Sequence, residues 1–532
     1  MHLAIGSPFW KRGALALLGG AERATPAAER FDALVARELL VRHPESRFPT
    51  EEELAFRHAL LRDGAYASLP EAERARAHRL AADWLEGAGE VDPLILAVHR
   101  ERGGEPARAA VCYLRAARRA LAGSDALGAH AHAGRALALG PDDALRLEVL
   151  QTLSFASFAS GQLADAERWT AEILAVAPRG SAPWCAAAAT RIMILMQHAD
   201  PGASSFGIAA AEGVEATSEN AGSLLWLVST ISRVFSMAGH LPLAARYHDR
   251  AEAIAAALGE SVDPGSLGLF HSTRALIRLY VDLDLSRALR DAEQAVRCLV
   301  EAGDRIHEAS ARYGMGVILA HLGAFERAEV ELRRAIEGSA PGFFVEIGGR
   351  VTLAVALAGR GALEEAEGEA ARAVAESRRT GNRFIEVVAR TSLAYVLLQR
   401  GEPASAEREA RAALALGFTD EVCRSVEAPV VLAQTLLLQG KVAEALSLAR
   451  DLSRPGAAIA TVVRLMAREV EAMALVAAGE RDAARPLLGA LRAEILAIAD
   501  GIEDEALRET FLTRSIWSAP LLRLAEAEGV SA

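Results

Sequence analysis

The sequence predicts an all-α fold, a superhelical solenoid of about ten stacked helical hairpins preceded by a small unit of different character. A short phrase recurs along the chain, in which Gly is followed by an apolar or small residue two positions later and by Ala five positions later. Ala and Leu are abundant, and aromatic residues make up only 5% of the 532 residues, which favours helices throughout. Residues 1–90 differ from the rest of the chain and show no periodic series of the phrase.

The phrase begins at nearly constant intervals of 38, 40, 39 and 39 residues in the C-terminal part of the chain. A fixed period of this size is typical of stacked helical hairpins, in which each repeat contacts mainly its neighbours. The glycines that open the phrase are Gly323, Gly361, Gly401, Gly440 and Gly479. Weaker copies lie upstream, at Gly104, Gly161, Asp200–Gly202, Gly239 and Leu283, where the turn glycine is missing.

Each part of the phrase has a structural role. The Gly ends the first helix because it accepts a left-handed conformation. The apolar residue anchors the second helix, and the small Ala lets two helices approach closely; small or apolar residues continue at helical spacing, as at Leu332 and Ala335. This pattern resembles the tetratricopeptide repeat over about four-fifths of the chain, with a period of about 39 residues in place of about 34, so we expect longer helices.

The first 90 residues predict a different local structure. An apolar pattern predicts a helix over Phe31–His43, which His43–Pro49 breaks, and Glu53–Arg57 then reads as a short strand. Helices are expected to follow at His58–Ser68 and Glu71–Glu86. Helix, short hairpin and helix in this order predict a small winged-helix-like unit.

A distinctive run connects this unit to the repeats, at Phe56–Tyr66, Leu69–Arg74 and His78–Leu85. It resembles the junction between winged helix and repeats in STAND-type signalling ATPases and in large bacterial serine/threonine kinases. The resemblance implies a junction unit over residues 1–90 and a repeat solenoid over 91–532 that serves as sensor or docking arm. In such proteins a kinase domain and a nucleotide-binding domain come before the junction.

The chain carries no phosphoryl-transfer motif. The P-loop pattern GxxxxGK[ST] is absent, since Gly440-Lys441 is followed by Val442, and no kinase Gly-rich loop, HRD or DFG occurs. We therefore expect a non-catalytic interaction and sensing module that binds a partner or effector in the solenoid groove. Two alternatives remain: the C-terminal part of a multidomain serine/threonine kinase or ATPase whose catalytic domains are missing from this chain, and a free-standing scaffold.

One histidine of the junction run is a candidate for nucleotide sensing in trans. The resemblance implies that His58 contacts the phosphate of a nucleotide held by a partner ATPase. The simpler interpretation, which we favour, is that His58 opens a helix and hydrogen-bonds locally.

Arginine recurs eleven residues before the repeat glycine, at Arg312, Arg350, Arg390 and Arg468. Equivalent positions of stacked hairpins line up along one side of a solenoid, so this ladder is a candidate for holding an acidic or phosphorylated peptide. The alternative, which we favour, pairs each Arg with a neighbouring carboxylate, such as Glu346, Glu386 or Glu427.

The resemblance to tetratricopeptide repeats also implies which side chains face the inner groove. Mixed aromatic and amide side chains suit peptide capture, where aromatic residues often anchor the ligand. The alternative is that several of them belong to the core between repeats. These candidates are Tyr313, His321, Thr391, Tyr395, Gln399 and Gln434.

Composition argues against several other classes of partner. The net charge of −12 disfavours binding to nucleic acid, and no apolar run approaches the roughly 20 residues that cross a bilayer. We expect a cytoplasmic protein without cofactor or metal, because neither the cysteines nor the histidines show a metal-binding spacing. These residues include Cys112, Cys185, Cys298, Cys423, His130, His132 and His307.

Overall fold

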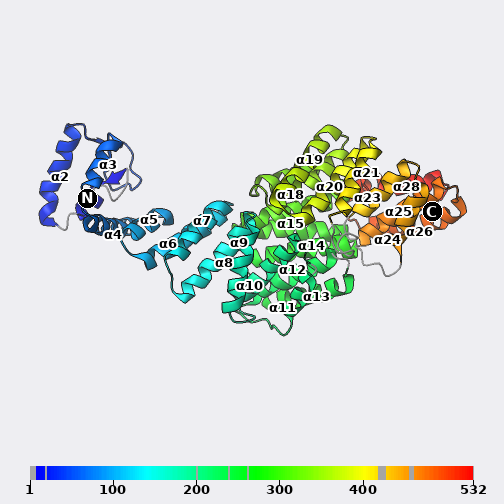
Figure 1. The fold of residues 1–532 in the computed structure, drawn as a ribbon, viewed down its shortest axis with the longest axis horizontal. Helices are drawn as coiled ribbons and strands as arrows, with labels where there is room; N and C mark the ends of the chain where they lie inside the picture. The colour runs from blue at the N-terminus through cyan, green and yellow to red at the C-terminus, as the bar shows by residue number, and fades with distance from the viewer. Residues whose placement is uncertain are drawn as a thin grey trace. The chain divides into compact units, whose positions relative to one another are not determined.

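The computed structural model describes residues 8–17, 21–198, 200, 202–237, 240–259, 263–416, 427–454 and 461–530, with the backbone alone for 21–28. Its described part contains 27 α-helices and three short strands, which confirms the all-α prediction (Figure 1). Contacts divide the chain into two compact units. The first comprises Met1–Leu121 and Leu127–Leu153, and the second comprises Ala122–Ala126 and Ser154–Ala532.

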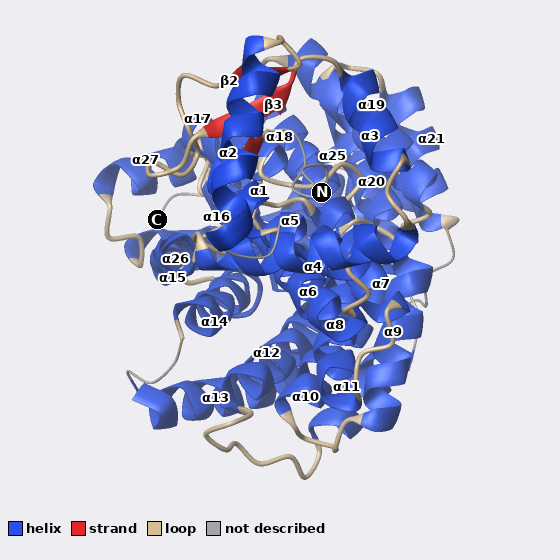
Figure 2. Ribbon diagram, turned by 90° about the vertical axis from the view of Figure 1, so that its left-hand side faces the viewer, coloured by secondary structure: helices blue, strands red, loops and turns tan. Residues whose placement is uncertain are grey.

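The first unit begins with a small antiparallel sheet and four helices. Strand order in the sheet is β1-β3-β2, with Phe9 opposite Leu54 and Leu40 opposite Phe56. Strands β2 and β3 are red in Figure 2. The elements are β1 (Phe9–Trp10), α1 (Lys11–Ala16), α2 (Ala21–Ala36), β2 (Leu40–Arg42), β3 (Glu53–Phe56), α3 (Ala59–Ala67) and α4 (Glu71–Gly87).

The strand expected at Glu53–Arg57 and the two helices after it are confirmed by β3, α3 and α4. The helix expected over Phe31–His43 is wrong at its C-terminal end. Helix α2 stops at Ala36, Glu38 takes a positive φ of 57°, and Leu40–Arg42 becomes β2. The reason is tertiary, since backbone pairing with β3 and burial of Leu40 outweigh the local helical pattern.

A polar cluster joins α4 to the next helix of the first unit. Arg100 of α5 (Pro93–Arg102) is only 2% exposed, and its guanidinium reaches carboxylates of Asp83, Glu86 and Glu105 at 2.6, 2.6 and 2.7 Å. Three ion pairs to one buried Arg compensate the cost of taking its charge out of water. Helices α6 (Pro106–Ala122), α7 (Ala126–Ala138) and α8 (Asp143–Ala159) follow, the last of which ends in the second unit.

The second unit is a series of antiparallel helix pairs that pack in chain order. In one of them a π-helical segment, η2, extends the first helix (α14) up to the turn. The elements are α9 (Leu163–Val176), α10 (Ala182–Gln197), α11 (Gly202–Ala211), α12 (Ala221–Met237), α13 (Leu241–Leu258), α14 (Pro264–Ile277), η2 (Arg278–Asp282), α15 (Leu285–Ala302), α16 (Arg305–His321), α17 (Phe325–Glu337), α18 (Phe344–Gly359), α19 (Leu363–Thr380), α20 (Arg383–Gln399), α21 (Pro403–Leu414), α23 (Ala428–Leu438), α24 (Val442–Ser453), α25 (Thr461–Ala477), α26 (Arg481–Asp500), α27 (Glu505–Arg514) and α28 (Ser518–Ala527).

The repeat phrase lies where the periodicity predicts, at the turn inside each pair. Gly323 and Gly361 have φ values of 74° and 82°, so the left-handed turn is confirmed. In the repeat without a turn glycine, Leu283 itself adopts φ 55°. Gly239, the corresponding residue of an upstream repeat, lies outside the described residues, as does Cys423.

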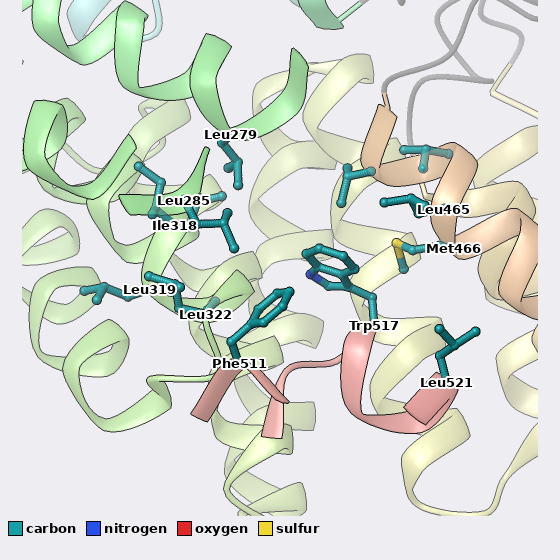
Figure 3. Packing of buried hydrophobic residues seen from close by; sticks show 14 of the residues in the cluster. Leu279, Leu285, Ile318, Leu319, Leu322, Leu465, Met466, Phe511, Trp517 and Leu521 are labelled. Atoms are coloured by element: carbon teal, nitrogen blue, oxygen red, sulfur yellow. The ribbon is translucent and has the colours of Figure 1, made fainter. Parts of the chain in front are cut away.

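The solenoid of the second unit closes on itself through contacts between helices that are far apart in sequence. Thr510 Oγ1 donates to the carbonyl of Leu322 at 3.0 Å, and Arg514 pairs with Glu326 at 2.8 Å, both across 188 residues. These partners are about five repeats apart at about 39 residues per repeat. Trp517, 2% exposed, packs in the same core cluster as residues of η2 and α16 (Figure 3). The C-terminal helices therefore contact the middle of the solenoid.

A glycine marks the point of closest approach. A Cβ atom on Gly323 would lie 2.7 Å from the carbonyl oxygen of Thr510 and 2.8 Å from the backbone nitrogen of Ser515. Both distances are shorter than a Cβ contact tolerates, and both atoms belong to the backbone. Gly323 is thus needed for its φ and for the space it leaves to the closing segment.

Candidate functional site

The first helices of successive hairpins in the second unit line a single cavity. Side chains from α10, α12, α14, η2, α16, α18, α20, α23 and α25 contribute to it, and Ile516, after α27, adds a residue of the closing segment. One repeat position recurs around the wall, the residue six places before the turn position. In the six consecutive repeats with turn positions at Gly239, Leu283, Gly323, Gly361, Gly401 and Gly440 it is Arg233, Ile277, Val317, Val355, Tyr395 and Gln434.

The cavity has a volume of about 260 Å³ and a mainly apolar wall. Several of its hydroxyl groups are occupied within the protein. Thr391 Oγ1 donates to the Val387 carbonyl at 2.8 Å, and Ser392 Oγ donates to the Val351 carbonyl at 3.0 Å. These hydroxyls satisfy backbone groups of the helices, so they contribute little polarity to the cavity.

Two charged side chains of the wall have no ion-pair partner among the described residues. Arg233 comes from α12, and Glu427 precedes α23. Burial lowers the pKa of the Arg233 guanidinium and raises the pKa of the Glu427 carboxyl. No ion pair in the described part of the chain joins the two. The cavity therefore has a cationic and an acidic group that no described residue compensates with an ion pair.

Three tyrosines lie between or beside these groups. Tyr313 interacts electrostatically with both Arg233 and Glu427, and its pKa is raised by burial. Glu427 also interacts with Tyr280 and Tyr395, whose pKa values burial raises as well. The hydroxyl groups of Tyr280 and Tyr395 make no hydrogen bond to another described residue. Glu427 thus interacts with three tyrosines of the wall, and one of them, Tyr313, also interacts with Arg233.

His321 connects the cavity to the closing segment. It is 6% exposed, and its Nδ1 has no hydrogen-bond partner within the described chain. Burial lowers its pKa to about 4, so the ring is neutral at neutral pH. Its ring centroid lies 6.2 Å from that of Tyr280 and 6.4 Å from that of Trp517. A molecule in the cavity would therefore contact the aromatic group that holds the C-terminal helices.

Five of the six side chains proposed for the inner groove line this cavity. Gln399 does not, because it lies exposed at the end of α20. The cavity residues that sequence reasoning missed include Arg233, Glu427 and Tyr280. The repeat position six places before the turn is a signal by which Arg233 could have been found. The five that line the cavity are Tyr313, His321, Thr391, Tyr395 and Gln434.

The arginine ladder is paired internally. Arg350 contacts Glu346 at 2.6 Å and Glu369 at 2.7 Å, so it bridges its own helix and the second helix of its hairpin, as Arg312 and Arg390 also do. The favoured interpretation of local pairing is thus confirmed for Glu346 and Glu386, but it is wrong for Glu427, which lines the cavity. The remaining pairs are Arg312 with Glu308 and Glu331, Arg390 with Glu386 and Glu409, and Arg468 with Glu494.

The first unit presents its own candidate surface. Helix α3 has no buried residue, and Leu60 on it is 85% exposed. His58 is exposed directly before α3, and its side chain makes no capping hydrogen bond there. The local hydrogen bond to the helix start that we favoured for His58 is therefore not formed.

The described residues contain no group of three or more His, Cys, Asp or Glu side chains able to hold a metal ion. Nor does any helix in the described ranges have the length and apolar character to span a membrane.

No protein-family model and no curated protein matches the chain. Solved structures of helical-repeat proteins do. The chain is similar to a Rap protein complexed with Competence and Sporulation Factor, with a TM-score of 0.43 and 13% identity over 65% of this chain and 99% of that one. It is similar to NprR in complex with its cognate peptide NprX (TM-score 0.39, 14% identity, 64% of this chain and 98% of that one). A STAND protein with a tetratricopeptide repeat sensor from Pyrococcus horikoshii matches with a TM-score of 0.36 and 13% identity over 82% of this chain, which spans 59% of that protein.

Proposed function

We propose that this protein is a non-catalytic interaction and sensing module, whose second unit binds an effector or a partner segment in the cavity of the solenoid. The observation that carries the proposal is the wall itself, which leaves Arg233, Glu427 and the Nδ1 of His321 without a partner among the described residues. Buried polar groups of a folded protein are normally satisfied, and exceptions cost free energy. A ligand that supplies the partners removes this cost.

The size of the cavity limits what it holds. Small-molecule sites typically enclose about 300–1,000 Å³. At about 260 Å³ the cavity lies just below that range. The bound group is therefore a small effector or a few residues of a chain, and a folded partner domain has to bind elsewhere.

We propose that the junction over residues 1–90 carries the signal of the solenoid over 91–532 to an ATPase or kinase module in trans. The exposed helix α3, with Leu60 on its surface, supports a contact there. His58, which is free of a capping bond at the start of α3, is the candidate for the nucleotide of that module. In the alternative, this chain is part of a longer kinase or ATPase. The same surface then contacts the catalytic part of that protein.

The cavity is tested with two matched tryptophan variants. Gln434→Trp places a large ring in the cavity, and Gln399→Trp places it on the exposed end of α20. The dialysable fraction of the source cell should raise the unfolding temperature of the wild type and of Gln399→Trp but not that of Gln434→Trp. No shift for the wild type would reject the cavity as a sensor.

The contact in trans has a separate test. The full chain serves as bait in its own lysate, and Leu60→Asp should lose a captured ATPase or kinase. Leu438→Asp, at a leucine that is 63% exposed in the second unit, is the matched control and should retain it. If the Leu60→Asp variant captures the same proteins as the wild type, the free-standing scaffold is favoured.

A further inference from the structure

The position of Arg233 in the repeat shows that its charge is a local feature of the cavity. Five of the six residues that stand six places before the turn position are uncharged, and Arg233 is the exception. The arginines of the ladder lie at another repeat position, and each has a carboxylate partner. Arg233 therefore does not belong to the internal pairing scheme of the solenoid.

An unpaired guanidinium in such a wall favours an anionic ligand. Arginine keeps its proton in proteins, so the charge cannot be removed by titration as it can for a lysine. Its planar fork of N–H donors matches a carboxylate, which it binds through two parallel hydrogen bonds. No described side chain supplies that carboxylate to Arg233, since Glu427 forms no ion pair with it.

The second charged group of the wall, Glu427, favours a donor. Glu427 interacts electrostatically with Tyr280, Tyr313 and Tyr395, which line the same cavity. No described cation reaches it within ion-pair distance. An ammonium group would supply the missing charge, and aromatic faces nearby also attract cations.

The uncharged polar groups of the wall suit an amide backbone. The hydroxyls of Tyr280 and Tyr395 and the amide of Gln434 make no hydrogen bond to other described side chains or backbone, while Met193 and Met196 provide an adaptable apolar surface. A hydrocarbon chain would leave the hydroxyls and the amide unsatisfied. A peptide backbone offers them both donors and acceptors.

We propose that the cavity binds a short apolar peptide with free termini, its C-terminal carboxylate on Arg233 and its N-terminal ammonium directed to Glu427. This inference rests on the proposed sensing function and names its ligand class. The volume of about 260 Å³ restricts the peptide to a few residues.

The test uses the full chain and three matched pools of synthetic tripeptides built from Ala, Val, Leu and Phe. One pool has free termini, one is amidated at the C-terminus, and one is acetylated at the N-terminus. Decanoic acid forms a fourth arm, as an apolar carboxylate without amine or amide groups. Protein-bound compounds are separated by rapid gel filtration and identified by mass spectrometry.

The free-termini pool should yield retained peptides, and amidation should reduce their retention at least about tenfold, because a neutral amide leaves the guanidinium unpaired. Arg233→Gln should abolish the preference for the free acid, and Glu427→Gln should abolish the preference for the free amine. Arg468→Gln is the matched control, since Arg468 pairs with Glu494 and does not line the cavity.

A stability measurement shows that the variants are folded. Arg233→Gln should unfold at a temperature at least as high as that of the ligand-free wild type, because it removes a buried charge without partner. A variant that binds nothing and also unfolds early would be replaced by Arg233→Met, which keeps the length of the side chain.

The outcomes distinguish failure of the peptide assignment from failure of the sensing function. Equal retention of free and amidated peptides, or retention of decanoic acid without tripeptides, overturns the peptide assignment. Failure of every pool while the dialysable cell fraction still stabilises the wild type overturns this inference and leaves the sensing function standing. Failure of the cell fraction as well rejects the sensing function itself.

Discussion

The closure of the solenoid predicts that two equivalent glycines differ in their tolerance of alanine. Gly323 and Gly361 occupy the same position of their repeats, with φ values of 74° and 82°. A Cβ atom on Gly361 meets nothing within 4 Å, whereas one on Gly323 meets backbone atoms of Thr510 and Ser515 at 2.7 and 2.8 Å. Gly361→Ala therefore reports the cost of the left-handed turn alone, about 1–2 kcal/mol.

Gly323→Ala adds the displacement of the closing segment. Overpacking in a well-packed site costs about 1–3 kcal/mol, so we expect Gly323→Ala to lose about 2 kcal/mol more than Gly361→Ala. The displacement also opposes the hydrogen bond from Thr510 to the Leu322 carbonyl and the ion pair between Arg514 and Glu326.

Urea unfolding of the full chain measures the difference, and hydrogen exchange locates it. Amides of α27 and α28 should exchange faster in Gly323→Ala and at the wild-type rate in Gly361→Ala. Equal losses of stability in the two variants, with unchanged exchange in α27 and α28, would refute the contact between these helices and the turn at Gly323.

Three further predictions concern ionisable groups. Arg350→Ala leaves Glu346 without its ion-pair partner and Glu369 with only the exposed Arg372, and it should cost about 3 kcal/mol in urea unfolding, against less than about 1 kcal/mol for Arg372→Ala; equal costs would contradict the buried pairing. Burial lowers the pKa of His78 and His99 from 6.5 to about 4 and about 3, so the unfolded chain binds protons that the folded chain does not. Stability is complete above about pH 6.5 and falls as the pH drops toward 4, and His99→Gln should make this fall shallower in thermal unfolding at a series of pH values. Burial raises the pKa of Glu469 from 4.5 to about 8, so stability is lost as the pH rises between these values. Glu469→Gln should raise the unfolding temperature near pH 8 and change it little near pH 4.5, and the reverse order would contradict the assignment.

The repeat architecture could be predicted because local chemistry repeats. The turn at Gly323 and the buried small residues after it depend on backbone conformation and close helix packing, which a short phrase encodes. Leu283 shows the limit of this reasoning. It adopts the left-handed turn without glycine, because the surrounding repeats dictate the conformation.

The cavity was predictable only in part. Tyr395 and Gln434 stand at the recurring position six residues before the turn, and their place in the groove follows from the repeat. Arg233 stands at the same position, six residues before Gly239, so the repeat alone could have located it. Glu427 looked like another ladder partner. Its lack of an ion-pair partner among the described residues depends on which helices meet across the solenoid, and that is set by the superhelical pitch and not by local sequence.

The closing contact makes folding of the middle of the solenoid depend on helices that are synthesised last. A linear array of hairpins gains stability one repeat at a time, and its N-terminal part is complete before the C-terminal part is made. Here α16 and η2 acquire partners that are translated about 190 residues later, so burial of their inner face waits for α27 and α28. His321 lines the cavity and its ring lies beside that of Trp517. A molecule bound in the cavity before α27 and α28 are synthesised would therefore cover the inner face of α16 until these helices pack against it. The ligand would then act as a folding template as well as a signal.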